Sequence, residues 1–351
     1  MVTICDFSAV ATGQEEVNVD AVKAVLSSVK ESIFSIRKGV CNVSADYDYS
    51  VLEKGKWKDS SYDYRYFIAF DDDDGMIRYD RINPLDSGRP EQVVLTPSLG
   101  VGAPADSTRR NSDGSDPSRV IGKFDPSQPG DMLKKNLIDP VIMPLLPERA
   151  FAFFTNQRKY RDRVLGDNIT AGAEVLMRTG DDGRVVVDIH WQHPVERELS
   201  LELDSRKGYR PLMRSSRHRG TVSGEWSTPD VVKTQWTKQN DVYVPSRIEV
   251  SGEDTEHKAS LLFSLDWSSV NEPVDPSLFT LDAMHPQDGD EVVQVVGDKM
   301  VLEEVIGSPS PPQVREQLTR RGSQGLSLWF LVTFNVVVVV AIVVWYLVFR
   351  R

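Results

Sequence analysis

Apolar residues recur at helical spacing near the start of the chain and then alternate with polar residues over most of its length. The stretch 17–38 has the three-to-four-residue period of an amphipathic helix, whose apolar face consists of Val22, Val25, Leu26, Val29, Ile33 and Ile36. After Gly39 the period becomes two, which is typical of strands that bury one face. The chain therefore predicts a helix followed by an antiparallel meander.

The alternating segments are separated by turns rich in Gly, Asn and Asp. They predict strands at 43–51, 62–70, 76–80, 185–191, 199–203, 232–236, 242–250 and 261–267. The apolar face of such a sheet needs a cover, because each large side chain that becomes buried contributes about 1.5–3 kcal/mol. We expect the helix at 17–38 and a Pro-punctuated helical stretch at 132–163 to supply it. The predicted fold class is α+β: a curved antiparallel sheet, an unclosed barrel, covered by helices.

One long segment and the C-terminal region interrupt this pattern. Residues 84–130 are rich in Pro, Gly, Ser and Asp, so we expect a loop-rich insertion with a candidate strand near 93–95. The stretch 326–349 carries no charge, and its 24 residues would reach roughly 36 Å as a helix. Trp329 and Trp345 lie near its ends, as interfacial residues do. We therefore predict one C-terminal transmembrane helix.

These segments give a domain plan. In it, residues 1–16 are an N-terminal segment and a candidate remnant of an export signal, residues 17–283 are the half-barrel domain with its insertion, residues 284–325 are an extension and tether, residues 326–349 are the transmembrane helix, and residues 350–351 are a basic end. The plan predicts a single-pass membrane protein whose globular domain is extracytoplasmic, in a bacterial periplasm. If Met1 is the true start, the alternative is a cytoplasmic domain with a tail anchor.

Charge and motif content exclude several functions. The net charge is −11 and the basic residues are scattered, so we expect no nucleic-acid partner. His190 and His193 are three positions apart on a strand and point to opposite faces, and the aspartates at 71–74 do not fit a calcium-loop register. No nucleophile, phosphate-binding or dinucleotide motif is present. We predict no enzyme activity, no catalytic residue, no metal and no cofactor.

Four segments carry a resemblance to a known family. They are the opening helix running into IRKGVCNVSADYDYS, then LELDSRKGYRPLM, the hairpin VVKTQWTKQNDVYVPSRIEV, and the closing LDWSSVNEPVDPSLFTL. In their order the chain resembles the bacterial lipoprotein-carrier (LolA/LolB-like) half-barrel family over roughly residues 17–283. The resemblance implies an unclosed antiparallel barrel whose concave face holds acyl chains or other apolar ligands.

The resemblance and the aromatic pattern together give a functional hypothesis. We expect a non-catalytic, membrane-anchored binding domain for a lipid-like or apolar group, with the lipid bilayer as a partner and a lipid or lipoprotein as a candidate ligand. The alternative is an envelope scaffold or protein-interaction module with a filled core and no ligand; no protein partner is identified. The predicted ligand-lining residues are Tyr64, Tyr66, Trp191, Trp236, Phe263 and Trp267.

Overall fold

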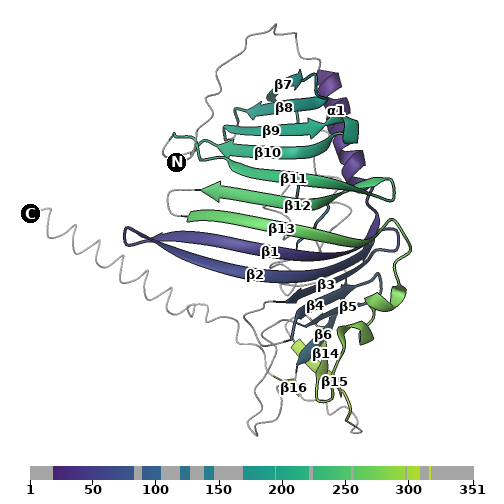
Figure 1. The fold of residues 1–351 in the computed structure, drawn as a ribbon. Coiled ribbons are helices and arrows are strands. Elements are labelled where there is room, and N and C mark those ends of the chain that lie inside the picture. Colours follow the sequence, from purple (N-terminus) through teal and green to yellow (C-terminus); the bar gives the residue numbers. More distant parts are fainter. Residues whose placement is uncertain are drawn as a thin grey trace, which may run out of the picture.

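A computed structural model describes residues 19–82, 89–103, 119–126, 138–145, 169–193, 195–220, 224–253, 257–296, 299–308 and 316–317. Within these residues the chain forms one α-helix, α1 (Val19–Phe34), and a single sheet of sixteen strands (Figure 1). The strands are β1 (Lys38–Glu53), β2 (Lys56–Asp71), β3 (Met76–Ile82), β4 (Glu91–Leu95), β5 (Gly100–Ala103), β6 (Val120–Phe124), β7 (Ala173–Thr179), β8 (Arg184–Trp191), β9 (Arg197–Asp204), β10 (Arg210–His218), β11 (Asp230–Gln239), β12 (Val242–Glu253), β13 (His257–Val270), β14 (Glu291–Val296), β15 (Lys299–Val305) and β16 (Glu316–Gln317).

The strand order is β16-β15-β14-β6-β5-β4-β3-β2-β1-β13-β12-β11-β10-β9-β8-β7. Most neighbours are antiparallel and consecutive in sequence, as in a meander, whereas β14 runs parallel to β6. At the centre of the sheet β1 pairs with β13, so that Gly39 lies opposite Val270. The sheet is curved and does not close on itself (Figure 1).

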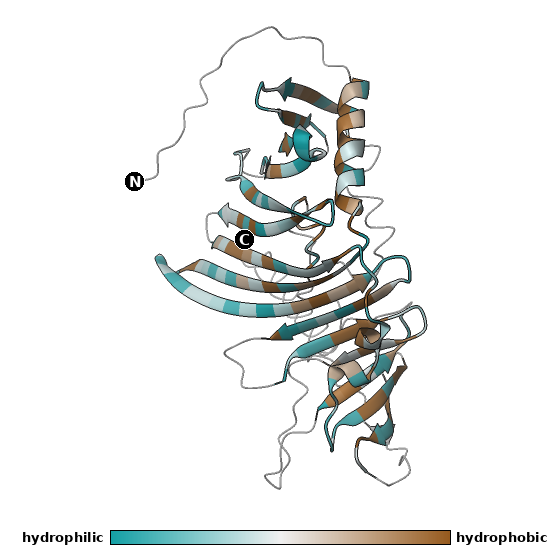
Figure 2. Ribbon diagram, turned by 45° about the vertical axis from the view of Figure 1, so that its right-hand side comes forward, coloured by the Kyte–Doolittle hydropathy of each residue, from teal (hydrophilic) through white to brown (hydrophobic). Residues whose placement is uncertain are grey.

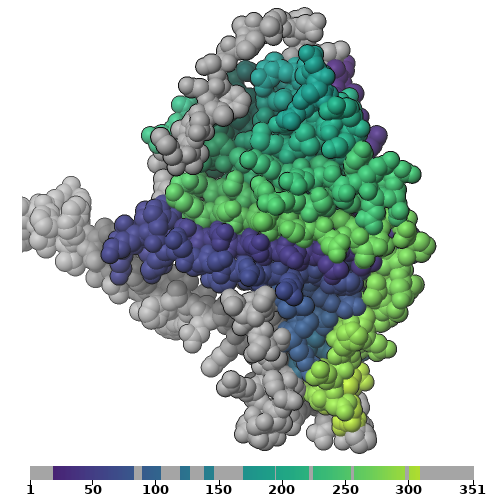
Figure 3. Space-filling model, in the orientation of Figure 1, coloured from purple at the N-terminus to yellow at the C-terminus, as the bar shows by residue number. Residues whose placement is uncertain are grey.

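Tight turns fix the register of the β1–β2 and β11–β12 hairpins. Between β1 and β2, Lys54 and Gly55 both have positive φ, and between β11 and β12 Asn240 and Asp241 do so as well. Two consecutive positive φ values are the requirement of the turn that best matches the twist of paired strands. The β1–β2 hairpin is sixteen residues long on each side and projects beyond its neighbours (Figure 3).

The main core lies on one face of the sheet and includes the apolar stripe of α1. Val22, Val29 and Ile33 are at most 1% exposed, and α1 contacts β7 and β10. Asn271, which directly follows β13, ties the end of the helix to the sheet: its side chain donates to Ser35 O at 2.7 Å and accepts from Arg37 N at 2.8 Å. The helix is thereby held over the strands that it covers.

Residues 138–145 add a second cover on the same face. They form turns and not a helix, and their apolar side chains are at most 2% exposed and belong to the main core: Ile138, Val141, Ile142, Met143 and Leu145. A part of the concave surface is thus filled by the chain itself.

A smaller core lies on the other face of β3 to β6. Two 3₁₀-helices, η5 (Pro276–Phe279) and η6 (Asp282–Met284), bring Phe279 and Met284 against Ala69, Val94, Val101 and Ile121. The strands β3 to β6 are therefore covered on both sides, which accounts for their almost continuous burial.

Two parts of the predicted fold class are wrong. The described residues contain one α-helix. Within the predicted helical cover at 132–163 the described part, 138–145, is irregular, because its prolines prevent continuous helix hydrogen bonding. No described helix has the length and apolarity needed to cross a membrane, so the predicted transmembrane helix is not supported, nor is the single-pass membrane localisation that depended on it. The predicted span, 326–349, lies outside the described residues.

Two segments of the domain plan contain more regular structure than their composition predicts. Residues 84–130, expected to be loop-rich, contribute β4, β5 and β6, and residues 284–325, expected to be an extension and tether, contribute β14, β15 and β16. Residues 1–16 and 350–351 lie outside the described part of the chain.

Candidate functional site

Strand alternation places a row of tyrosines on the concave face, near the tip of the β1–β2 hairpin. Tyr47 lies opposite Tyr62 on β2 and opposite Leu261 on β13, and Tyr64 lies opposite Ala45. Since side chains two apart share a face, these tyrosines continue the face that buries Val43 deeper in the sheet. Figure 2 shows the hairpin changing from hydrophobic near the core to hydrophilic toward its tip.

The tyrosines enclose a cavity of about 260 Å³, which we call the tyrosine cavity. It is bounded by β1, β2, β3 and β13, through Tyr47, Asp48, Tyr49, Tyr62, Tyr64, Tyr66, Arg81, Ala259 and Leu261. Five of these nine side chains are phenol rings, so the walls are largely apolar surface with hydroxyl groups at the ring edges.

Hydrogen bonds and charges fix these walls. The hydroxyls of Tyr47 and Tyr66 are 3.0 Å apart and hydrogen-bonded to each other. The Arg81 guanidinium lies 5.5 Å from the centre of the Tyr64 ring and forms an ion pair with Glu91 at 2.7 Å. Burial raises the pKa of both Tyr47 and Tyr66, so both phenols are neutral at physiological pH.

The tyrosine cavity adjoins the main core without a break. The Tyr47 ring meets Phe263 edge-on at 5.7 Å between ring centres, and Tyr66 meets the fully buried Tyr79 at the same separation. One aromatic cluster therefore forms both the floor of the cavity and the end of the core.

The residues predicted to line a ligand site are divided between the cavity and the core. Tyr64 and Tyr66 line the tyrosine cavity, and Phe263 lies beneath it. The three predicted tryptophans do not line it: each indole N–H donates to a backbone carbonyl, from Trp191 to Ile169 at 3.1 Å, from Trp236 to Pro211 at 2.7 Å and from Trp267 to Pro245 at 2.8 Å. These tryptophans connect neighbouring segments of the chain.

The prediction omitted several lining residues. Tyr47, Tyr49 and Tyr62 belong to the same alternation as Tyr64 and could have been selected on that basis. Leu261 shares the alternation of Phe263 and could have been selected in the same way. Arg81 and Ala259 carry no local signal, because they reach the cavity only through the pairing of β3 with β2 and of β13 with β1.

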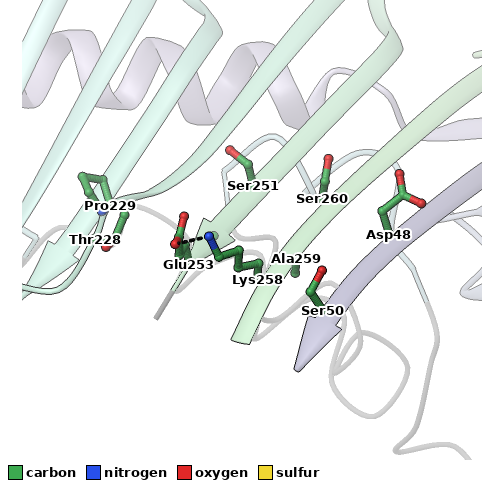
Figure 4. A pocket seen from close by; sticks show the side chains of 10 residues that line it. Asp48, Ser50, Thr228, Pro229, Ser251, Glu253, Lys258, Ala259 and Ser260 are labelled. Carbon is green, nitrogen blue, oxygen red and sulfur yellow. Dashed lines mark ion pairs between the residues drawn. The ribbon is translucent and has the colours of Figure 1, made fainter. Parts of the chain in front are cut away.

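Two further hollows have a different character. Asp48, Ser50, Ser251 and Ser260, together with the ion pair between Lys258 and Glu253 at 2.7 Å, line a polar hollow of about 300 Å³ (Figure 4). The other hollow, of about 460 Å³ over β7, β8 and β9, includes the side chains of Glu174, Asp188, His190 and Glu198. His190 contacts Glu196 at 3.3 Å, and within the described residues no group of three or more His, Cys, Asp or Glu side chains is placed to hold a metal ion.

The described residues form an unclosed, mostly antiparallel sheet with a helix on one face, and a comparison with solved structures finds several similar chains. A LolA superfamily protein from Nitrosomonas europaea is 13% identical, with 74% of this chain and 98% of that chain covered and a TM-score of 0.33. A putative outer membrane lipoprotein-sorting protein domain from Vibrio parahaemolyticus is 9% identical, with 74% and 97% covered and a TM-score of 0.35. A DUF1329 family protein from Desulfovibrio piger is 7% identical, with 76% and 98% covered and a TM-score of 0.37.

The sequence matches no model of a known protein family and no curated protein. Two of the solved structures are named for the LolA superfamily or for lipoprotein sorting, as is the family that the sequence segments resemble. At these identities and TM-scores the likeness says nothing about the ligand, and the functional proposal depends on the tyrosine cavity.

Proposed function

We propose that this protein binds an apolar, lipid-like group in the tyrosine cavity. The observation that carries the proposal is an aromatic-walled cavity on the concave face, continuous with the main core. An apolar group that enters it removes its own surface and that of the rings from water, which is favourable by about 25 cal/mol per Å² of apolar area.

The polar atoms of the walls suit such a ligand. Because the Tyr47 and Tyr66 hydroxyls bond to each other, an apolar group can cover these two rings without leaving that pair of hydroxyls unsatisfied. Arg81, already paired with Glu91, supplies a positive charge at the margin of the cavity, where a polar end of the ligand can remain.

The volume limits the size of the bound group. Small-molecule sites usually enclose roughly 300–1,000 Å³, and the tyrosine cavity, at about 260 Å³, lies near the lower end. This size fits one hydrocarbon chain or a ring better than a complete two-chain lipid. Each buried methylene adds about 0.8 kcal/mol, so we expect affinity to rise with chain length until the cavity is full.

We infer a binding role without catalysis. The raised pKa values of Tyr47 and Tyr66 leave neutral phenols where a reaction would need a nucleophile or a base. Arg81 is engaged by Glu91 and by the Tyr64 ring.

A second candidate function is an interaction module that takes up no ligand. The observation that favours it is the burial of residues 138–145 in the main core, because they occupy concave surface that a ligand would otherwise use. In that case the exposed surfaces, and not the cavity, would carry the function.

The test compares two tryptophan substitutions one residue apart on β13. Ala259 lines the tyrosine cavity, and Ala259→Trp should fill it and weaken binding of a long-chain fluorescent fatty acid by about tenfold or more. Ser260 lies on the opposite face and is exposed, so Ser260→Trp introduces the same ring outside the cavity and should leave the affinity unchanged.

Titrations with fatty acids of increasing length, followed by displacement of the fluorescent probe, complete the test. Saturable binding that strengthens with length and is lost only in Ala259→Trp would support the proposal. A folded protein that binds none of these probes would overturn it and favour the interaction module, and equal losses in both variants would place the ligand elsewhere.

A further inference from the structure

The strand at one end of the sheet, β7, presents an outer edge that pairs with no other strand of the described residues (Figure 1). The opposite end of the sheet finishes with β16, which has two residues and therefore offers little edge. By contrast, β7 has seven residues, AEVLMRT, without proline, glycine or a bulge in its pairing with β8. An edge of this kind is a template for pairing with a further strand.

The pairing with β8 determines which backbone groups of β7 face outward. Gly180 N donates to Arg184 O at 2.8 Å at the turn between the two strands. Since hydrogen-bonded pairs alternate along an antiparallel ladder, the backbone groups of Leu176 and Arg178 face β8. Those of Val175 and Met177 then face outward, with two donors and two acceptors available to another strand.

The side chains of β7 are complementary to those of a second β7. In an antiparallel pair centred on Leu176, Glu174 of each copy lies opposite Arg178 of the other, and Leu176 lies opposite itself. The side chains of Glu174 and Arg178 are 73% and 63% exposed, and Leu176 is 39% exposed. Val175 and Met177, which pack against the main core from the inner face, would oppose each other in the same pair.

We propose that two copies of this chain associate through their β7 edges into one continuous antiparallel sheet with two-fold symmetry. The partner is a second copy because the edge is complementary to itself in backbone direction, charge and apolar contact at one register. This inference is independent of the proposed ligand site, which lies on β1, β2, β3 and β13.

Contacts within one copy favour this arrangement. Arg178 forms an ion pair with Asp188 of β8 at 2.6 Å, and Glu174 accepts from Gln192 at 3.0 Å. These contacts hold both side chains along the outer face of β7, so fewer rotamers are lost when the second copy arrives. In the pair, Arg178 would lie between Asp188 of its own copy and Glu174 of the other.

The experiment uses two charge-reversal variants. Neither can pair with a copy of itself without like charges facing each other, but each can pair with the other. Glu174→Arg sets two arginine side chains against each other at both ends of the interface, and Arg178→Glu sets two glutamates together. Each variant alone should dissociate at least about tenfold more easily than the wild type. An equimolar mixture restores opposite charges across the interface and should form a heterodimer. Analytical ultracentrifugation of the full chain over a micromolar concentration series gives the masses.

Glu198→Arg serves as the matched control, because it reverses one charge on β9, two strands away from the edge. It should dimerise as the wild type does, and circular dichroism verifies that all variants fold. A wild type that is monomeric over the whole series would overturn the proposal. So would a dimer that persists in both single reversals, or a mixture that stays monomeric.

Discussion

At the scale of single residues, Asp139 has a carboxyl group that is buried in the apolar core. It is 1% exposed, its Oδ1 accepts from Val141 N at 2.9 Å, and its Oδ2 has no hydrogen-bond partner among the described residues. Burial raises the pKa of this carboxyl from 3.8 to about 7. An aspartate in such a place is costly when ionised, and residues 138–145 are therefore held against the sheet best when Asp139 carries a proton.

The free energy of unfolding should depend on pH through the titration of Asp139. Between about pH 4 and pH 7 the folded state retains a proton that the unfolded chain releases, so the free energy of unfolding falls as the pH rises through this window. Asp139→Asn keeps the acceptor for Val141 N and removes the titration. The free energy of unfolding of Asp139→Asn minus that of the wild type should therefore be larger at pH 8 than at pH 5, by on the order of a few kcal/mol. Urea denaturation of both proteins at pH 5 and pH 8 measures these free energies. If the variant and the wild type differ by the same amount at both pH values, the raised pKa of Asp139 is contradicted.

Single residues also show what sequence reasoning can say about the lining of the tyrosine cavity and what it cannot. Tyr64 and Tyr66 were identifiable because a local alternation puts both on one face. Trp236 was selected by the same reasoning, but its ring stacks against the Arg210 guanidinium at 5.0 Å and its indole N–H is bonded to the backbone. Periodicity specifies the face of a strand, whereas the position of a residue along the cavity depends on pairing between distant strands.

At the scale of elements, the regular segments were the most predictable part. The apolar stripe of α1 and the alternation in β8, β9 and β12 have periods that local geometry imposes. The strand β10 was missed, since its burial does not alternate cleanly past the bulge between Pro211 and Met213. The stretch containing residues 138–145 was expected to cover the sheet, but its irregular conformation was not predicted, because a buried irregular segment has no period.

Asn271 offers a test of how elements are joined. Its φ is +55°, and its side chain bonds to Ser35 and Arg37 at the end of α1. Asn271→Ala removes these two hydrogen bonds and a longer one from Lys38 N at 3.3 Å. It also puts a residue with a poor left-handed preference at this position, so it should destabilise the protein by about 2–3 kcal/mol.

Asn271→Gly separates the two contributions. Glycine adopts the positive φ without steric cost, so this variant should lose stability only through the missing side-chain bonds and should be less destabilised than Asn271→Ala. Urea denaturation at neutral pH measures both. Equal stability of Asn271→Ala and the wild type would show that these bonds do not stabilise the helix end.

At the scale of the whole molecule, long-range pairing decides the architecture. Val43 of β1 pairs with Leu265 of β13, whereas Val187 of β8 pairs with Leu201 of the next strand along the chain. Both valines are at most 2% exposed, and truncating either to alanine should cost about 1–3 kcal/mol. Their effects on kinetics should nevertheless differ, because contacts near in sequence form with a smaller loss of chain entropy.

We expect the β7–β13 meander to form first and β1 to dock later. Val187→Ala should then mainly slow refolding, and Val43→Ala should mainly accelerate unfolding. Stopped-flow fluorescence in urea gives both rates for each variant. The opposite distribution of the two effects would mean that the centre of the sheet forms before the meander.

The pairing of β1 with β13 also has a consequence during synthesis. Gly39 reaches its partner Val270 only after 231 further residues have been translated, which takes about 10–50 s at ordinary ribosomal speeds. Throughout that interval the apolar face and one edge of β1 have no permanent neighbour on the β13 side, and such edges are prone to aggregate. Binding of a chaperone to β1 would therefore be an advantage during this period. In the finished sheet both edges of β1 are paired, one with β2 and one with β13.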